Sequence, residues 1–177
     1  MTLEEELGEV AARSGAAAVL PAETGPGDRV YLLAFEEADG GRTWLAVDAA
    51  GDAVTDRGRV RDAVSILALC ELAAETAAGG DLDELRAQLA ALRVTEAPPG
   101  IEEAEDAALE LQRVLGTPPT VASPARLDEI GVAVRRLELA LNGAGQSSPF
   151  AAAMKAAGDV VESLWTDVAG SYRAALR

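Results

Sequence analysis

The spacing of hydrophobic positions changes along the chain, from a short helical pattern to a strand pattern and then to a long helical part. At the start, Thr2 and Glu5 form a capping box. The apolar residues behind it recur at helical spacing: Leu3, Leu7, Val10 and Ala11. Gly15 then supplies a stop signal. The sequence therefore predicts a first helix that ends near Gly15.

The next segment has the pattern of a small antiparallel sheet. Residues 16–20 are apolar and end at Pro21, which predicts a short strand. Residues 30–37 have apolar side chains on both faces, so we expect both faces of this strand to be covered. A glycine-containing turn joins it to residues 42–48, the predicted antiparallel partner, and residues 53–55 predict a brief edge strand.

From about Arg59 onward the apolar residues recur at helical spacing. The first of these helices has such a wide apolar surface that we expect it to lie largely buried against the sheet, and to end at Gly79-Gly80. Further helices are predicted between capping signals on one side and glycine or proline on the other. They begin near residues 82, 101, 124 and 149.

These elements predict an α+β fold. A small antiparallel sheet, built on the hairpin 30–37/42–48, is packed by helices and followed by a C-terminal helical bundle that ends in a long helix. Pro98-Pro99-Gly100 predicts a boundary between an α+β domain (1–97) and the bundle (101–177); alternatively the two form one compact domain.

The last helix has the most regular pattern of the chain. Its apolar residues step by three and four almost to Arg177, which corresponds to a length of roughly 40 Å. Trp165 and Tyr172 lie seven residues apart, close to one face, and are residue types enriched at interfaces. This helix either packs wholly within its own chain or projects and pairs with a second subunit; we expect self-association.

Charge limits the partners that this chain can bind. The 177 residues hold 30 acids and 15 bases, a net charge of −15. Residues 1–118 hold 24 acids and nine bases, whereas residues 119–177 hold six of each. Such a field repels nucleic-acid phosphates and anionic membranes, so a basic protein is the favoured partner. No signal sequence or apolar stretch long enough to span a bilayer is evident, and we expect a cytoplasmic protein.

The residue types available restrict the chemistry. There is no histidine, which excludes Ser-His-Asp and Cys-His catalysis and makes zinc improbable. Any metal site would consist of oxygens and would suit a hard ion such as magnesium, calcium or manganese. The single cysteine, Cys70, lies in an apolar run and is expected to be buried and unreactive. We expect no cofactor, no resident metal and no catalytic residue.

Two clusters of acids are candidate sites. Glu4, Glu5, Glu6 and Glu9 form the first, and the second lies at residues 102–106. Carboxylates on successive helical turns can hold magnesium, but acids in the first turn of a helix are commonly solvated and interact with the helix dipole, which is the preferred interpretation. The candidate partner-binding residues are Glu102, Glu103, Glu105, Asp106, Trp165 and Tyr172.

The favoured function is a non-catalytic acidic binding or adaptor protein that engages a basic protein and self-associates. In outline, its helix–sheet–helix plan resembles that of small acidic chaperones, which implies a chaperone-like role by analogy of fold only. One alternative is a carboxylate- and Mg/Mn-dependent phosphohydrolase. Another is an acidic mimic of nucleic acid.

Overall fold

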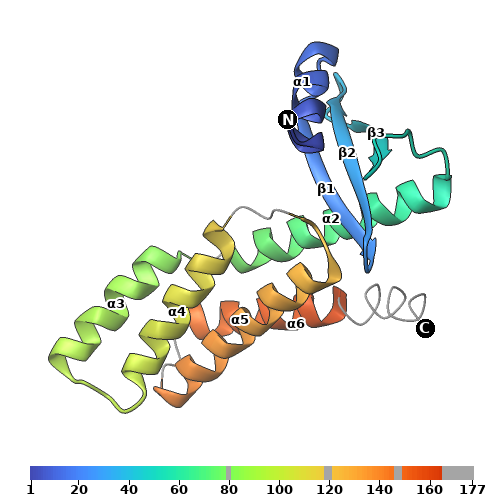
Figure 1. Ribbon diagram of the computed structural model, residues 1–177. Coiled ribbons are helices and arrows are strands. Elements are labelled where there is room, and N and C mark those ends of the chain that lie inside the picture. Colours follow the sequence, from blue (N-terminus) through green and yellow to red (C-terminus); the bar gives the residue numbers. More distant parts are fainter. Residues whose placement is uncertain (79–80, 118–120, 146–148, 165–177) are drawn as a thin grey trace.

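The computed structural model describes residues 1–78, 81–117, 121–145 and 149–164, and has an α+β fold (Figure 1). A small sheet stands at one end of the molecule and a helical bundle at the other, with one helix running between them. The elements in chain order are α1 (Leu3–Ser14), β1 (Ala18–Gly25), β2 (Asp28–Glu36), β3 (Arg42–Asp48), α2 (Arg57–Ala78), α3 (Leu82–Thr95), α4 (Ile101–Gly116), α5 (Pro124–Gly143) and α6 (Pro149–Leu164).

The local signals at the N-terminus are confirmed. Thr2 caps α1 by accepting a hydrogen bond from the backbone of Glu5, and the Glu5 side chain accepts one from the backbone of Thr2 in return. Gly15 ends the helix in the left-handed conformation, which a residue without a Cβ adopts at little cost. Of the predicted apolar face, Leu7 and Ala11 are buried and Leu3 is partly buried, whereas Val10 is 42% exposed, so α1 packs with part of that face.

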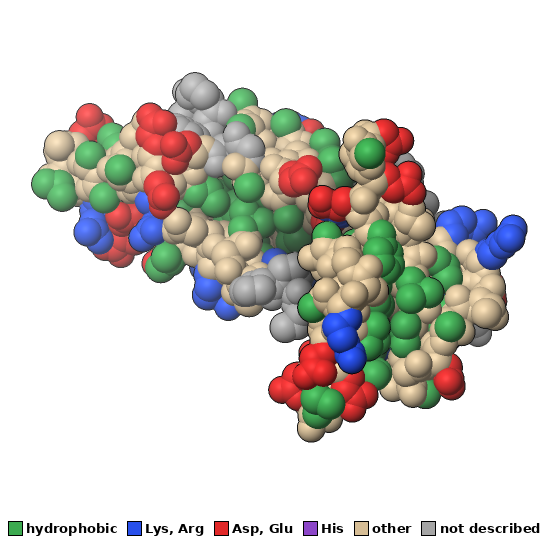
Figure 2. Space-filling model, turned by 90° about the horizontal axis from the view of Figure 1, so that it is seen from above, with side chains coloured by type: hydrophobic (Ala, Val, Ile, Leu, Met, Phe, Trp, Pro, Cys, Tyr) green, Lys and Arg blue, Asp and Glu red, His purple; other side chains and the backbone are tan. Residues whose placement is uncertain are grey.

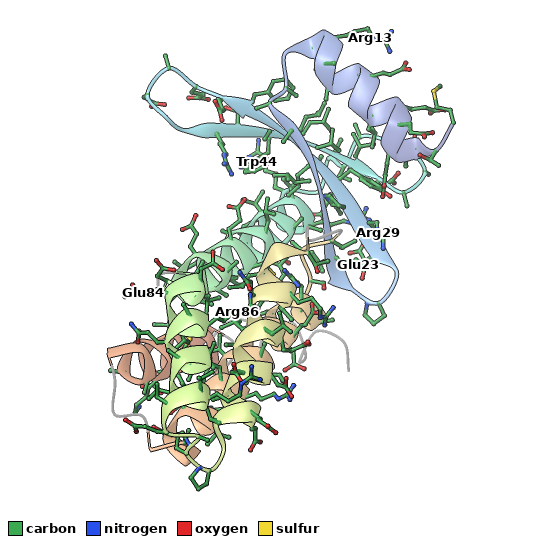
Figure 3. All side chains as sticks on the ribbon, turned by 90° about the vertical axis from the view of Figure 1, so that its left-hand side faces the viewer. Arg13, Glu23, Arg29, Trp44, Glu84 and Arg86 are labelled. Carbon is green, nitrogen blue, oxygen red and sulfur yellow. The ribbon has the colours of Figure 1, made fainter. Side chains whose placement is uncertain are left out.

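The sheet is an antiparallel meander of order β1-β2-β3, and it confirms the predicted hairpin. Both of its faces are covered, as the apolar pattern of β2 required. Tyr31 and Leu33 face α1 in a small second core, whereas Val30 and Leu32 face α2 in the main core. Trp44 of β3 is half-buried on the α2 side (Figure 3).

The prediction for the first strand is wrong in its bounds, because β1 does not stop at Pro21 but continues to Gly25. The reason is that the backbone nitrogen and carbonyl group of Pro21 point away from β2, toward Ala122. Its carbonyl oxygen accepts a hydrogen bond from the backbone N–H of Ala122, at 2.9 Å. The nitrogen of Pro21 points to the same side as its carbonyl. The N–H group that proline lacks would therefore not have donated a hydrogen bond to β2, and the β1–β2 pairing is unaffected.

The predicted edge strand at residues 53–55 is also wrong. Ala53 makes only an isolated bridge with Val47, and the backbone N–H of Val54 donates to the carbonyl of Ala46. The chain then leaves the sheet to begin α2 at Arg57. Three residues that follow the tight turn around Gly51 therefore pair with β3 too briefly to form a strand.

Helix α2 connects the two ends of the molecule. It contacts β1 and β2 on one side and α5 and α6 on the other. By length and composition alone, Arg57–Thr95 holds a window of mean hydropathy 1.3 that would suffice to cross a membrane. In the fold, six apolar residues of α2 are buried in the protein core: Ala63, Ile66, Leu67, Cys70, Ala73 and Ala77.

The bundle consists of neighbouring helices that pack pairwise, α3 on α4, α4 on α5 and α5 on α6. Its apolar residues and those on the α2 side of the sheet form one continuous core, from Ala22 to Ala157. In α6, Met154 and Ala157 are buried, as their spacing predicted. The predicted end of α2 at Gly79-Gly80 lies outside the described residues, as do the side chains of Phe150, Val161 and Leu164 and everything from Trp165 onward.

Candidate functional site

Acidic side chains on the surface form several separate groups. In the view of Figure 2, red groups lie at both ends of the molecule with hydrophobic and basic side chains between them. The sheet end, residues 1–56, is the most unbalanced part, with twelve acids and three arginines. A net charge of −9 on this end makes it the strongest electrostatic attractor for a basic ligand.

Most carboxylates at the sheet end have a local structural role, among them Glu5 in the cap of α1, but the other three carboxylates of α1 do not. Asp48 accepts hydrogen bonds from the backbone N–H groups of Ala50 and Asp52, and Asp56 accepts from Gly58 in the same way. These are ordinary turn contacts. On α1, by contrast, three exposed side chains make no hydrogen bond or ion pair with any described residue: Glu4, Glu6 and Glu9.

A groove of about 430 Å³ lies beside α1, over the edge of the sheet. Glu4 stands on its α1 side, and Val19 and Tyr31 contribute apolar surface from β1 and β2. Arg29 also lines this groove, where its guanidinium forms an ion pair with Glu23 at 2.8 Å. Figure 3 shows these two side chains next to each other on the β1–β2 pair. The hydrogen bond with Glu23 raises the pKa of Arg29, so the guanidinium keeps its charge beside the Glu23 carboxylate.

Sequence reasoning did not find this groove. The sequence places Glu4 in an acidic first turn and Tyr31 in a strand that is covered on both faces, and neither position indicates a groove. Their proximity depends on how α1 crosses the sheet and on the register that places Pro21 opposite Tyr31. Neither feature leaves a signal in the local sequence.

The acids of α4 occupy the first turns of that helix, as predicted. Glu102, Glu103 and Asp106 are exposed and have no ion pair or hydrogen bond within the described part of the chain. Glu105 differs, because it is half-buried and pairs with Arg93 of α3 at 3.4 Å. Three of the four candidate carboxylates thus share one solvated surface, and the fourth joins two helices.

A second groove, of about 620 Å³, follows the outer side of α5. Val132 and Leu139, both more than 60% exposed, give it an apolar floor. Arg135 and Arg136 line it from α5, and Glu103 lies at its α4 side. Large apolar side chains exposed along one helix are typical of a surface that binds another protein.

The potential catalytic groups do not converge in the part of the molecule that is described. No three carboxylate or cysteine side chains among those residues lie close enough together to hold a metal ion. Cys70 is buried, and this burial raises the pKa of its thiol, which favours the protonated form. The candidate residues Trp165 and Tyr172 lie outside the described residues.

Comparisons with known proteins give no relative from which a function could be transferred. The chain matches no protein-family model, no curated protein and no solved structure.

Proposed function

We propose that this chain is a non-catalytic binding protein, adaptor-like or chaperone-like, that holds a basic protein partner at its sheet end. The observation that carries the proposal is the set of unpaired α1 carboxylates, Glu4, Glu6 and Glu9. Exposed carboxylates without a partner attract cations, and they give up no existing ion pair when a cation binds. Met1, which precedes α1, and Val10, which lies on it, are both exposed and add apolar contact area.

The groove beside α1 supports a basic partner in particular. A lysine or arginine side chain has an apolar stem and a charged end. In this groove the stem would lie along Val19 and Tyr31, and the charged end would reach Glu4. Arg29 would not repel the incoming cation strongly, since Glu23 already neutralises its charge.

The exposed α4 acids, Glu102, Glu103 and Asp106, are proposed as a second contact for the same class of partner. They lie in the bundle, at the other end of the molecule from α1 (Figure 1). A basic partner long enough to reach both ends would contact two acidic surfaces of one protein. Self-association is part of the proposal.

Two matched variants test this function. E4Q/E6Q/E9Q and E102Q/E103Q/D106N each remove three exposed negative charges from the first turns of one helix, so their net charges are equal. The probe is a fluorescent nona-arginine peptide, and its dissociation constant is measured by anisotropy at about 50 mM and about 500 mM salt. With roughly 0.2–1 kcal/mol for each exposed charge pair, we expect the α1 variant to bind about tenfold more weakly at low salt.

The comparison between the two variants decides the outcome. A larger loss for the α1 variant supports the sheet end as the main contact, and a smaller, separate loss for the α4 variant supports the second contact. Equal losses would mean that the peptide responds only to net charge, which would contradict the proposed site. Binding that does not weaken at high salt would contradict the electrostatic basis of the proposal.

A further inference from the structure

Helix α5 has an outward face that its own chain leaves exposed. Its inward residues, among them Leu127, Ile130 and Leu137, are completely buried against the neighbouring helices. On the opposite side, Val132 and Leu139 are 62% and 63% exposed. They lie seven residues apart and therefore share one face of the helix. We define Ala125, Val132 and Leu139, which recur at this interval, as the α5 stripe.

The charges beside the α5 stripe are arranged symmetrically about Val132 and opposite in sign. Glu129 and Arg136 lie on one flank of the stripe, and Asp128 and Arg135 lie on the other. On one flank the acid precedes Val132 by three residues and the arginine follows it by four; on the other flank the acid precedes it by four and the arginine follows it by three. This arrangement is self-complementary, as an isologous contact needs, because each copy offers the charge that the other copy lacks at the facing position.

We propose that two copies of this protein associate through the α5 stripe, with their α5 helices antiparallel and a two-fold axis at Val132. Glu129 of each copy then faces Arg136 of its partner, and Asp128 faces Arg135. Leu139 comes opposite Ala125, so a large side chain meets a small one. The inference names the surface for the self-association included in the proposed function.

The charges left unpaired within one chain agree with this arrangement. Asp128 and Arg136 form no ion pair or hydrogen bond among the described residues. Glu129 pairs with Arg126 at 2.7 Å, and Arg135 pairs with Glu138 at 2.8 Å and with Glu162 of α6 at 2.5 Å. Each proposed contact between copies therefore joins one unpaired charge to one that is already held in position.

Other occupants of this face fit less well. A parallel pair of α5 helices would bring Glu129 next to Asp128 of the other copy and Arg136 next to Arg135 of the other copy, and like charges repel. The basic partner of the proposed function would meet the unpaired Arg136 in the same groove. The second copy in antiparallel orientation is thus the occupant that the charges favour.

Charge reversal tests the contact. R136E places a carboxylate opposite Glu129 of the other copy, and E129R places a guanidinium opposite Arg136. Each single variant should raise the dimer dissociation constant about tenfold or more, since the symmetric dimer contains each contact twice. The double variant E129R/R136E restores opposite charges and should return to within about threefold of the wild type. Sedimentation equilibrium measures all four proteins against the monomer mass of 18.2 kDa.

Recovery of dimer formation in the double variant cannot come from a new ion pair within one chain. Positions 129 and 136 are about 10 Å apart along α5, which is too far for a direct pair on one helix. Circular dichroism melting checks that all variants are folded, as expected for changes at exposed positions. A wild type that stays monomeric at several hundred micromolar, or a double variant that dimerises no better than the singles, would overturn the proposal.

A second measurement uses the symmetry axis itself. A residue on a two-fold axis meets its own copy, so V132C should form a disulfide-linked dimer readily with oxidised glutathione. V160C is the control, because Val160 is exposed on α6 and away from the axis, and the native Cys70 is buried. Equal rates for V132C and V160C would contradict the antiparallel α5 contact. Neither assay involves a basic partner, so its failure is distinct from failure of partner binding.

Discussion

Arg59, in the first turn of α2, donates a hydrogen bond from Nε to Oδ1 of Asp28 at the start of β2, at 2.9 Å. The other carboxylate oxygen of Asp28 accepts a hydrogen bond from Thr24 at 2.6 Å. One carboxylate therefore connects the β1–β2 turn to the helix that leads into the bundle. The groove beside α1 lies on the same two strands, β1 and β2. The hydrogen bonds of Asp28 with Arg59 and Thr24 therefore help to fix the position of this groove relative to α2.

The first prediction is that Asp28 makes stability depend on pH in the acid range. Its hydrogen bond with Thr24 and its interaction with Arg59 lower its pKa from the ordinary value of 3.8. The contribution to stability is therefore present above the pKa of the unfolded state, and it is lost as the pH falls through the lower pKa of the folded state. Because Asp28 is 40% exposed, we expect at most about 1 kcal/mol.

Urea denaturation of D28N and wild type at pH 7 and at pH 3 checks this. The stability difference between the two proteins should shrink at the lower pH. D52N is the control, because the Asp52 side chain has no ion pair or hydrogen bond among the described residues. A difference for D28N that stays constant with pH would show that Asp28 does not act through its charge.

The second prediction concerns the single cysteine. Burial raises the pKa of the Cys70 thiol, and its Sγ lies 3.5 Å from the carbonyl oxygen of Ser123, so little thiolate is present near neutral pH. Modification by a disulfide reagent should be at least about a hundredfold slower in the native protein than in urea. A rate close to that of free cysteine would instead indicate an accessible, reactive thiol.

How well the sequence predicted each feature depends on how local the responsible interaction is. The capping box of Thr2 and the Ser123-Pro124 start of α5 involve residues within one turn, and both are present as predicted. The extension of β1 past Pro21 depends on Ala122, a hundred residues away in the chain. Only the folded arrangement shows that this proline needs no hydrogen-bond donor.

In the candidate site, too, the local features were predictable from the sequence and the long-range contacts were not. Exposure of Glu102, Glu103 and Asp106 was predictable, because acids in the first turn of a helix are commonly solvated. The pairing of Glu105 with Arg93 was not, since it depends on how α3 packs against α4. The groove beside Glu4 likewise requires knowledge of how α1 lies on the sheet.

The third prediction tests the cap of α5. The Oγ of Ser123 accepts a hydrogen bond from the backbone N–H of Arg126 at 3.1 Å. S123A should lower the free energy of unfolding by about 1 kcal/mol, whereas S123D, which keeps a capping oxygen, should lower it much less. Urea denaturation measures both variants. Equal losses would mean that the serine acts through its packing near Cys70 and not as a cap.

The fourth prediction separates the two faces of α5 with a matched pair of leucines. Leu137 is fully buried, and L137A should lower the free energy of unfolding by about 2–5 kcal/mol, because it leaves a cavity in the core. Leu139, two residues further on, is 63% exposed, and L139A should change the stability of the monomer by less than about 0.5 kcal/mol. Urea denaturation at low protein concentration, where a dimer contributes little, measures both effects. If L139A proved as destabilising as L137A, Leu139 would be part of the core of one chain, and the α5 stripe would no longer offer an apolar face to a second copy.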